Sequence, residues 1–493
     1  MTQRLRVLYI SPEVSPFAKS GELADVASAL PKYLSSLGID ISLVVPKYRR
    51  PEIESLALEL VVPELQVPLG GEKVKASVYR TELGKYAAYF IDNPKYFWRE
   101  KIYGPSTGDY LDNDERFIFF NRAVLEFLLK TKMPINILHC NSWPTALIPV
   151  FLRTLYSKES QFREAATVLT LHNAAYQGEF PPESLGLTGL EWNYFDSQQL
   201  PLTRKFNFLK VGLVYSDVVN TVSVTYKREI QTKKHGFGLE EILKSRKDCF
   251  FDIRNGVDYE IWNPETDTFI ASNYGPLHLE GKKKCKQDLI KEFGLSLRER
   301  TPVVVMTSYL THYKGFDLLL EAMDELVKMD LGLIICGQGD EKYENEFSKI
   351  QRQYPKKVAI RFEINPVLTH KIVAGADIFL IPSLYEPCGL NQLYSFRYGT
   401  VPVARAIGGL KETVKPFDLQ TGKGNGFIFK EYSPKALLQA LKKALDSYKK
   451  PSLWQKVMEA GFRENFSWEI AARKYCKLYK SALESKRGGR VGS

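Results

Sequence analysis

The feature that most constrains the fold is an alternation of short apolar runs with longer amphipathic stretches. Residues 5–11 form an apolar run, residues 23–37 repeat apolar side chains at helical spacing, and residues 39–46 form a second run. This order is typical of a βαβ unit, whose parallel strands need cover on both faces. The pattern therefore predicts an α/β fold built on doubly wound parallel sheets.

The alternation occurs in two series, each long enough for a domain. In the first half, further apolar runs lie at 135–140, 167–172 and 217–223. In the second half they lie at 301–308, 332–340, 357–363, 377–383, 401–406 and 426–430. A chain of 493 residues exceeds one ordinary core, and the turn-rich segment 255–267 separates the series. We therefore expect two Rossmann-like domains joined near 260–270.

Composition excludes several classes of protein. A hydrophobic content of 44% and a charged content of 25% are typical of a soluble globular chain, and no apolar run could span a bilayer. The six cysteines are scattered, and no cluster of His, Asp or Glu has metal-ligand spacing, so we expect no disulfide framework and no metal site. The first residues lack a signal-peptide core, which favours the cytoplasm. A plant chain with its transit peptide omitted would instead belong in the plastid stroma.

The net charge of +11 and the pI near 9.0 would be compatible with binding to nucleic acid. The lysines are dispersed in short clusters, without a basic stripe interleaved with aromatics and without an RNA-binding signature. A solvated surface that prefers anionic ligands explains this charge better. We expect neither nucleic acid nor a membrane as partner, and the sequence does not indicate an oligomeric state.

In the first half, polar residues follow the predicted strands, where open α/β sheets bind ligands. Glu13, Lys19, Gly21 and Asp25 surround the turn between the first strand and its helix, where free N–H groups can hold an anion. Glu22 places a carboxylate inside that turn. The sequence therefore predicts an anion cradle that carries an anion of its own.

Two further strand ends in the first half carry polar side chains. The stretch "LHCNSW" contains His139 and Trp143, which we interpret as a hydrogen-bonded histidine beside a buried aromatic. The stretch "TLHNAAYQGEF" places four polar side chains together, a set suited to sugar hydroxyls: His172, Asn173, Tyr176 and Gln177.

In the second half, Lys314 lies between a strand and a helix, where an ammonium group and free N–H groups suit a phosphate. Glu386 ends a later strand, Gly389 opens the next helix, and Gly408 with Gly409 repeats that turn one βα unit further on. A carboxylate that accepts hydroxyl donors beside two helix N-termini matches a sugar phosphate or a nucleotide sugar.

The chain resembles the bacterial glycogen synthase and plant starch synthase family nearly from end to end. The resemblance rests on these stretches: "SPEVSPFAKSGELADV", "YG…GDYLDNDERFIFFNRA", "TLHNAAYQG", "NFLKVGLVYSDVVNTVSVTYKREI", "NGVDYEIWNP", "SYLTHYKGFDLL", "EPCGLNQLYSFRYGTVPVARAIGGLKETV" and "FSWEIAARKYCKLY". It implies the GT-B architecture, with an N-terminal Rossmann-like domain at 1–265 on the glucan side and a nucleotide-sugar domain at 266–460. A C-terminal helical segment at 461–493 would cross back to the first domain, and the active site would lie in the interdomain cleft.

The family transfers glucose from ADP-glucose to the non-reducing end of an α-1,4-glucan, with retention and without a metal. The resemblance implies no cofactor besides the donor substrate, and a nucleotide sugar and a glucan as partners. By this resemblance Glu386 would hold glucose hydroxyls, Lys314 would neutralise the departing diphosphate, and the backbone carbonyl of His172 would face the oxocarbenium ion. The implied donor-binding set is Lys19, Gly21, Asn255, Lys314, Cys388, Gly389, Leu390, Gly408 and Gly409. The implied acceptor set is Glu13, Asp25, Asn173, Tyr176 and Gln177.

The chain departs from the family pattern at four places. Glu22 stands at the second glycine of Lys-x-Gly-Gly-Leu, Tyr309 replaces an arginine, and Ser142 replaces the aspartate before Trp143. Residues 364–366 read Ile-Asn-Pro where an aromatic platform for adenine is common. Because the departures cluster at the donor phosphates, three alternatives stay open: a weak synthase, a transferase with a changed donor, or an impaired paralogue that binds glucan as an initiation or regulatory factor.

Overall fold

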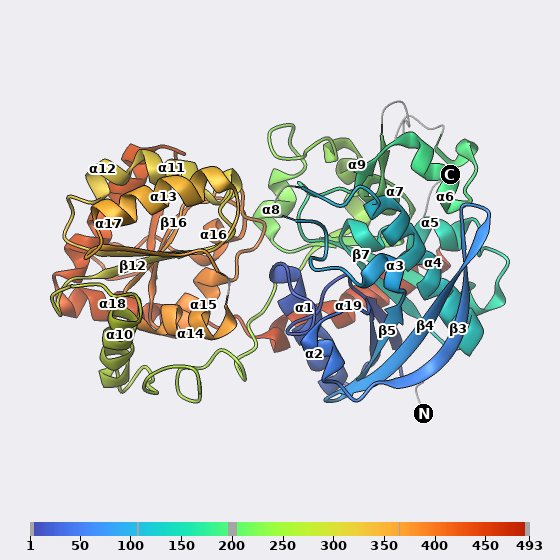
Figure 1. Ribbon diagram of the computed structural model, residues 1–493, viewed down its shortest axis with the longest axis horizontal. Coiled ribbons are helices and arrows are strands. Elements are labelled where there is room, and N and C mark those ends of the chain that lie inside the picture. The colour runs from blue at the N-terminus through green and yellow to red at the C-terminus, as the bar shows by residue number, and fades with distance from the viewer. Residues whose placement is uncertain (1–3, 106–107, 196–204, 364, 489–493) are drawn as a thin grey trace. The chain divides into compact units, whose positions relative to one another are not determined.

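The computed structural model describes residues 4–105, 108–195, 205–363 and 365–488, and the chain divides into two compact units (Figure 1). Unit 1 comprises residues 1–222, 227–256 and 468–493. Unit 2 comprises residues 223–226 and 257–467. Unit 1 is therefore assembled from both ends of the chain, whereas almost all of unit 2 is one continuous segment.

Unit 1 is built on a nine-stranded sheet with the order β11-β10-β7-β6-β1-β2-β5-β4-β3. Its parallel strands are β1 (Arg6–Ile10), β2 (Asp40–Pro46), β5 (Tyr86–Asp92), β6 (Ile137–Asn141), β7 (Ala166–Leu171), β10 (Val218–Thr221) and β11 (Phe250–Asp252). The antiparallel strands β3 (Glu59–Leu69) and β4 (Glu72–Leu83) form one edge, and β8 (Glu179–Phe180) pairs with β9 (Phe206–Asn207) separately. Because the chain runs outward from β1 in both directions, the switch point of the sheet lies between β1 and β6.

The helices of unit 1 flank this sheet. They are α1 (Glu22–Ser36), α2 (Pro51–Glu54), α3 (Pro94–Phe97), α4 (Asn113–Thr131), α5 (Ile148–Arg153), α6 (Leu185–Thr188), α7 (Phe208–Tyr215), α9 (Glu240–Ser245) and α19 (Trp468–Arg487). Helix α8 (Val224–Glu229) begins in unit 2 and ends in unit 1.

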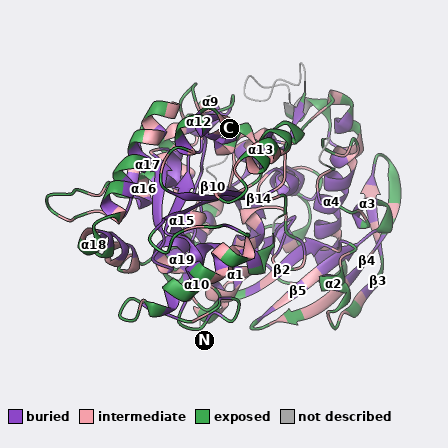
Figure 2. Ribbon diagram, turned by 60° about the vertical axis from the view of Figure 1, so that its left-hand side comes forward, coloured by how far each residue is buried: buried purple, intermediate pink, exposed green. Residues whose placement is uncertain are grey.

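Burial follows the expected pattern in the central strands. Every residue of β6 and β7 is buried, as expected for parallel strands covered on both faces. Strand β3 at the sheet edge instead mixes buried residues with intermediate and exposed ones, which indicates that one of its faces is in solvent (Figure 2). The search for continuous apolar runs does not predict the β3–β4 hairpin, because polar residues interrupt both of its strands.

Helix α19 joins unit 1 through a chain of buried hydrogen bonds. The Tyr479 hydroxyl donates to His139 Nδ1 (2.8 Å), and His139 Nε2 donates to Thr170 Oγ1 (2.7 Å). The Thr170 hydroxyl in turn donates to Asn220 Oδ1 (2.7 Å). These contacts tie α19 to β6, β7 and β10, and they agree with the interpretation of His139 as a buried, hydrogen-bonded histidine.

Unit 2 is built on a six-stranded, fully parallel sheet with the order β14-β13-β12-β15-β16-β17. The strands are β12 (Val303–Thr307), β13 (Gly332–Cys336), β14 (Val358–Arg361), β15 (Ile378–Ile381), β16 (Val401–Arg405) and β17 (Phe427–Phe429). Its helices are α10 (Glu280–Glu292), α11 (Phe316–Glu321), α12 (Met323–Leu326), α13 (Glu341–Gln353), α14 (Pro366–Gly375), α15 (Asn391–Arg397), α16 (Gly408–Thr413), α17 (Pro434–Tyr448) and α18 (Pro451–Phe462). The switch point lies between β12 and β15.

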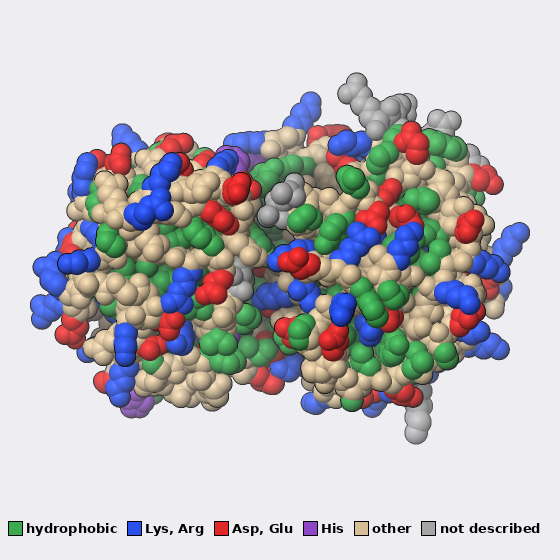
Figure 3. Space-filling view, in the orientation of Figure 1, with side chains coloured by type: hydrophobic (Ala, Val, Ile, Leu, Met, Phe, Trp, Pro, Cys, Tyr) green, Lys and Arg blue, Asp and Glu red, His purple; other side chains and the backbone are tan. Residues whose placement is uncertain are grey.

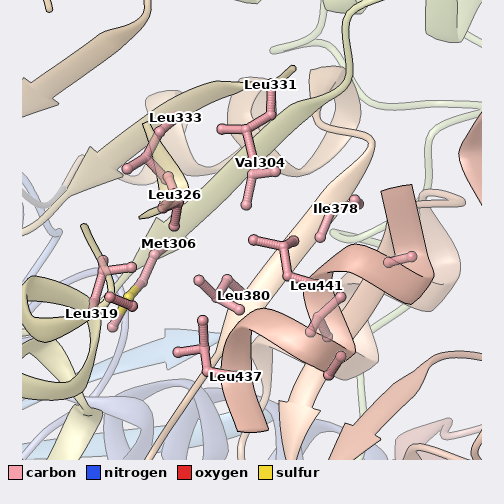
Figure 4. Packing of buried hydrophobic residues seen from close by; sticks show 14 of the residues in the cluster. Val304, Met306, Leu319, Leu326, Leu331, Leu333, Ile378, Leu380, Leu437 and Leu441 are labelled. Carbon is pink, nitrogen blue, oxygen red and sulfur yellow. The ribbon is translucent and has the colours of Figure 1, made fainter. Parts of the chain in front are cut away.

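Apolar side chains fill both faces of this second sheet. On one face, strand residues such as Val304 and Leu380 pack with Leu319 of α11 and Leu437 of α17 (Figure 4). On the other face, a second cluster joins the sheet to α10, α14 and α15. Because side chains are closely packed on both faces of the sheet, the ends of the strands are rigid and hold the loops that follow them in place.

Charged side chains of both signs are scattered over the visible surface (Figure 3). On the face drawn in Figure 3, lysines and arginines over unit 2 are interspersed with aspartates and glutamates. No helix among the described residues is both long enough and apolar enough to cross a bilayer.

Candidate active site

In each unit, predicted site residues follow strands at or beside the switch point. In unit 1, Glu13 follows β1, and Ser142, one of the departures from the family pattern, follows β6. In unit 2, Lys314 lies in the loop after β12, and Glu386 lies in the loop after β15. Ligands of open α/β sheets bind at this place, outside the carboxyl ends of the strands.

The centre of the candidate site in unit 2 is an ion pair between Lys314 and Glu386. Lys314 Nζ lies 2.9 Å from Glu386 Oε1 and 2.8 Å from Oε2. The Ser383 hydroxyl donates to Oε2 at 3.0 Å, and the Glu386 side chain is only 4% exposed. The structure thus brings together a cation and a carboxylate that the sequence predicted separately.

Gly408 and Gly409 allow α16 to begin against the loop that carries Glu386. A Cβ atom on Gly408 would lie 1.9 Å from the Glu386 carbonyl oxygen, and one on Gly409 would lie 2.1 Å from that of Cys388. The Gly409 N–H donates to the carbonyls of Glu386 and Pro387, both at 3.2 Å. In this structure the two glycines therefore position the Glu386 loop.

The residues between Glu386 and α15 are also fixed by local contacts. Gly389 has a φ of 70°, which favours glycine, and Cys388 and Leu390 are buried. The Gln392 amide donates to the carbonyls of Cys388 (3.0 Å) and Gly389 (2.8 Å). These contacts therefore fix the shape of this loop.

The turn before α1 in unit 1 is filled by a side chain of its own. Glu13 Oε2 accepts the backbone N–H groups of Ser20 (2.7 Å) and Gly21 (3.0 Å), and Oε1 accepts the Tyr103 hydroxyl (2.8 Å). Glu13 is only 3% exposed. In this structure Glu13 therefore fills the turn, whereas the sequence had placed the carboxylate of Glu22 inside it.

Lys19, Asp25 and Glu22 are the other charged residues of this turn. Lys19 Nζ binds both carboxylate oxygens of Asp25, at 2.7 and 2.8 Å. Glu22 is the first residue of α1 and is half-buried, and an added Cβ on Gly21 would meet no atom within 4 Å. Acidic side chains thus outnumber basic ones around the cradle, which disfavours a diphosphate there.

Tyr103 is a site residue that the sequence patterns missed. Its loop is held by α4: Asn113 Nδ2 donates to the Tyr103 carbonyl (2.8 Å), and Arg116 donates to the carbonyls of Tyr96 (2.7 Å) and Ile102 (3.0 Å). Tyr103, Asn113 and Arg116 lie in the stretch "YG…GDYLDNDERFIFFNRA", which could have pointed to them.

We expect the Glu13→Ala variant to loosen the cradle. Without the carboxylate, the N–H groups of Ser20 and Gly21 lose their acceptor, so their hydrogen–deuterium exchange should become at least ~10-fold faster. Mass spectrometry of peptides that cover residues 14–24 provides the measurement. Tyr103→Phe is the matched control, because it leaves both backbone contacts of Oε2 intact. Unchanged exchange in Glu13→Ala would show that the turn holds its shape by other means.

His172 follows β7 and is held by Asn141. His172 Nε2 lies 2.9 Å from Asn141 Oδ1, and burial lowers the pKa of His172 to about 3. The imidazole is therefore neutral at physiological pH. His172 thus enters the site as a hydrogen-bonding group and not as a cation.

The predicted acceptor residues near His172 differ in what they can offer a ligand. Gln177 is buried, donates to the carbonyls of Ala174 (3.0 Å) and Phe237 (2.9 Å), and accepts from Asn207 (2.6 Å). Asn173 accepts the Ala175 N–H at 2.9 Å, whereas the Tyr176 side chain is 58% exposed. Tyr176 is therefore more exposed than Gln177 and has more surface with which to contact a glucan.

Asn255, a predicted donor residue, is buried in unit 1. Its Oδ1 atom has no hydrogen-bond partner among the residues that the structure describes. A buried amide oxygen without a partner is costly, so it is suited to accept a donor group from a ligand.

The departures from the family pattern have local structural consequences. Ser142 adopts a φ of 58°, which is uncommon outside glycine, at the end of β6. Tyr309 is 37% exposed, and Asn365 caps α14 by accepting the N–H groups of Val367 and Leu368, with Pro366 as the first helical residue. Ile364 lies outside the described residues.

Two neutral histidines, His139 and His172, predict acid-sensitive stability. Burial lowers the pKa of His139 well below its usual value, and that of His172 to about 3. Below the unfolded pKa of about 6.5, the unfolded chain binds more protons, so each group lowers the free energy of unfolding by about 1.4 kcal/mol per pH unit. Between about pH 6.5 and pH 5 we expect a loss of about 2 kcal/mol for each histidine.

Urea unfolding at several pH values measures this effect. His172→Gln should flatten the pH dependence by about one proton, and the exposed His278 provides the control variant His278→Gln. An identical slope in His172→Gln and the native chain would contradict the expectation.

Models of two protein families match the chain. Residues 6–245 match the starch synthase catalytic domain, and residues 289–458 match the glycosyl transferases group 1. Together the two matches cover most of unit 1 and most of unit 2.

Curated relatives and a solved structure extend the similarity to nearly the whole chain. A glycogen synthase of Koribacter versatilis is 43% identical over 97% of this chain and 99% of its own length, and one of Thermotoga petrophila is 44% identical over the same shares. The catalytic domain of Starch Synthase IV from Arabidopsis thaliana, bound to ADP and acarbose, superimposes with a TM-score of 0.92 at 31% identity, covering 98% of this chain and all of that one. The predicted fold class, a GT-B architecture of two parallel-sheet domains, is thereby confirmed.

Proposed function

Because the chain belongs to the glycogen and starch synthase family of glycosyltransferases, we propose that it transfers glucose from ADP-glucose to the non-reducing end of an α-1,4-glucan, with retention of configuration. The observation that carries this proposal is the Lys314–Glu386 pair at the switch point of unit 2. It combines a cation for a leaving diphosphate with a carboxylate for sugar hydroxyls. The related starch synthase with ADP and acarbose supports an adenine nucleotide and a glucan as ligands.

The proposed transfer exchanges one bond at the anomeric carbon for another. The bond from this carbon to the diphosphate oxygen breaks, and the diphosphate leaves with the electron pair. The bond to the acceptor hydroxyl forms on the same face, and the hydroxyl proton passes to the departing phosphate. Catalysis of this kind rests on electrostatic stabilisation of the leaving group and of the oxocarbenium ion.

Lys314, Glu386 and His172 would each contribute a different interaction to this transfer. Lys314 exchanges its contact with Glu386 for the diphosphate, and Glu386 then accepts hydroxyl groups of the glucose. The His172 carbonyl faces the positive charge at the anomeric carbon. We assign no metal and no further cofactor to the reaction, and we propose the cytoplasm as its location.

The proposal includes a weakened donor site. Glu22 adds negative charge near the cradle, and Tyr309 offers one hydroxyl where the family has a guanidinium. Losing one charge-assisted contact costs about 1.5–3 kcal/mol, which slows a transferase without abolishing it. We therefore expect slow turnover of ADP-glucose in the native chain.

A donor comparison tests the proposed function. Purified protein is offered ADP-glucose, UDP-glucose or glucose 1-phosphate with glycogen, and incorporation of labelled glucose is measured. We expect ADP-glucose to be the best donor and NMR of the product to show new α-1,4 linkages. Faster transfer from UDP-glucose would indicate a changed donor. No transfer from any donor, together with retained glycogen binding, would identify a non-catalytic glucan-binding paralogue.

A further inference from the structure

We infer that Asn141, at the end of β6, is a positioning residue that fixes the ring of His172 with its proton on Nε2 and its lone pair on Nδ1. The inference deepens the proposed function, on which it rests, because it defines what the His172 side chain presents to the sugar. It concerns unit 1 alone, since β1, β6 and β7 all belong to that unit.

Asn141 is buried, and each of its polar groups has a partner. Its backbone N–H donates to Thr145 Oγ1 (2.6 Å), and its carbonyl accepts the Thr145 hydroxyl (3.0 Å). Its side-chain Nδ2 donates to the carbonyls of Ile10 (3.0 Å) and His139 (3.3 Å). Its Oδ1 faces the Tyr9 hydroxyl and His172 Nε2, both at 2.9 Å. Such a fully bonded amide holds one orientation.

The contacts of the amide determine its direction. Carbonyl oxygens only accept hydrogen bonds, so the side of Asn141 that faces Ile10 and His139 must be the NH₂ group. Oδ1 therefore faces His172, and an amide oxygen can only accept. The hydrogen on the His172 ring must then lie on Nε2, and a neutral ring carries its lone pair on Nδ1.

The consequence is that His172 offers an acceptor to its ligand. No hydrogen-bond partner of His172 Nδ1 lies among the described residues. A sugar hydroxyl can donate to this nitrogen, whereas the other tautomer or the imidazolium would present an N–H group instead. Asn141 thus selects a hydroxyl donor on the substrate through the ring that it orients.

The neutral amide also preserves the charge state of His172. Besides His172, the titratable residues that hydrogen-bond with Asn141 are Tyr9 on β1 and His139 on β6, the latter through its carbonyl. Burial raises the pKa of Tyr9 and lowers the pKa of His139, so both stay uncharged near neutral pH. A carboxylate at position 141 would instead stabilise the imidazolium of His172.

Nitrogen-15 NMR of histidine-labelled protein tests the inference without an activity assay. The chain has six histidines, and the His172→Gln variant assigns the signals of His172 by their loss. In the native chain we expect one neutral tautomer, with the proton on Nε2, from pH 6 to pH 9. Asn141→Asp should move the titration of His172 into the range that can be measured. Asn141→Leu should move the two ring shifts toward each other as both tautomers become populated.

Kinetics with ADP-glucose and glycogen provide the second readout. Both Asn141 variants should lose about 10- to 100-fold in kcat with KM changed less than ~3-fold, since misplaced groups cost rate more than binding. The Asn141→Asp variant should also lose rate as pH falls, whereas the native rate stays level. Tyr9→Phe is the matched control: it removes the other hydrogen bond to Oδ1 and should leave the His172 shifts unchanged.

Three outcomes would overturn the inference. They are a proton on Nδ1 in the native chain, His172 shifts in Asn141→Asp that match the native ones at every pH, and equal shift changes in Tyr9→Phe and Asn141→Leu. If Asn141→Leu fails to fold, the spectra of the native chain and of Asn141→Asp still test the inference. The expected NMR shifts in a native protein without glucosyl transfer would refute the proposed function and leave the hydrogen-bonding assignment standing.

Discussion

Replacing Glu22 by glycine together with Tyr309 by arginine is expected to raise the rate of transfer from ADP-glucose about 100-fold or more. A carboxylate about 5 Å from a phosphate charge repels it by about 3 kcal/mol per charge pair at an effective dielectric of about 20. Glu13 already occupies the backbone N–H groups of Ser20 and Gly21, and Lys19 binds Asp25. The cradle therefore has little positive charge with which to offset Glu22.

The second half of the double change supplies a cation. An arginine at position 309 offers a charged fork of N–H donors where the phenol of Tyr309 offers one hydroxyl. Tyr309 is 37% exposed, so a longer side chain fits without entering the core. Initial rates at matched ADP-glucose and glycogen concentrations provide the measurement.

A charge-only control separates electrostatics from backbone effects. Glu22 is the first residue of α1, where glycine costs about 1 kcal/mol of helix stability and an acid favours the helix dipole. Glu22→Gln removes the charge and keeps the length, so it should recover most of the gain expected from Glu22→Gly. A native rate typical of a full synthase would show that Glu22 points away from the phosphates. An inactive double variant would favour the non-catalytic paralogue.

Replacing Glu386 by alanine is expected to lower kcat/KM for transfer by about 100-fold, equivalent to about 3 kcal/mol. The change removes the acceptor proposed for the glucose hydroxyls. It also leaves Lys314 without the carboxylate that binds it at 2.8 and 2.9 Å in this structure. Steady-state kinetics and the affinity for a malto-oligosaccharide should be measured together.

Ser383→Ala provides the control for Glu386→Ala. It removes one hydrogen bond to Glu386 Oε2 and keeps the carboxylate, so we expect a loss of less than ~5-fold. Unchanged transfer and unchanged oligosaccharide affinity in Glu386→Ala would limit Glu386 to a local structural role in its own loop.

Periodicity predicted the two parallel sheets because nearly all of their strands are continuous apolar runs. It did not predict β3 and β4, whose residues alternate at a sheet edge. It also missed two parallel strands of the first sheet, β5 and β11. Nor could it pair Lys314 with Glu386, which lie 72 positions apart. That contact depends on β12 and β15 being neighbours across the switch point, a property of the strand order.

Side-chain partners were the least predictable part of the site. The sequence placed Glu13, Lys19 and Gly21 at one turn, but not Glu13 within it. It grouped Gln177 with sugar-binding residues, although its amide contacts Ala174, Phe237 and Asn207. A polar side chain after a strand can bind a ligand or close a loop, and only the tertiary contacts distinguish the two.

Unit 1 is formed by separate segments of the chain, and this affects how it can fold during synthesis on the ribosome. Residues 257–467 are continuous, so unit 2 has nearly all of its strands and helices before α19 has been translated. Unit 1 must wait for α19, because the His139–Thr170–Asn220 chain lacks the Tyr479 hydroxyl until then. The part of the first sheet that α19 contacts therefore stays uncovered in the nascent chain until α19 has been translated, and chaperones have most to protect before that point.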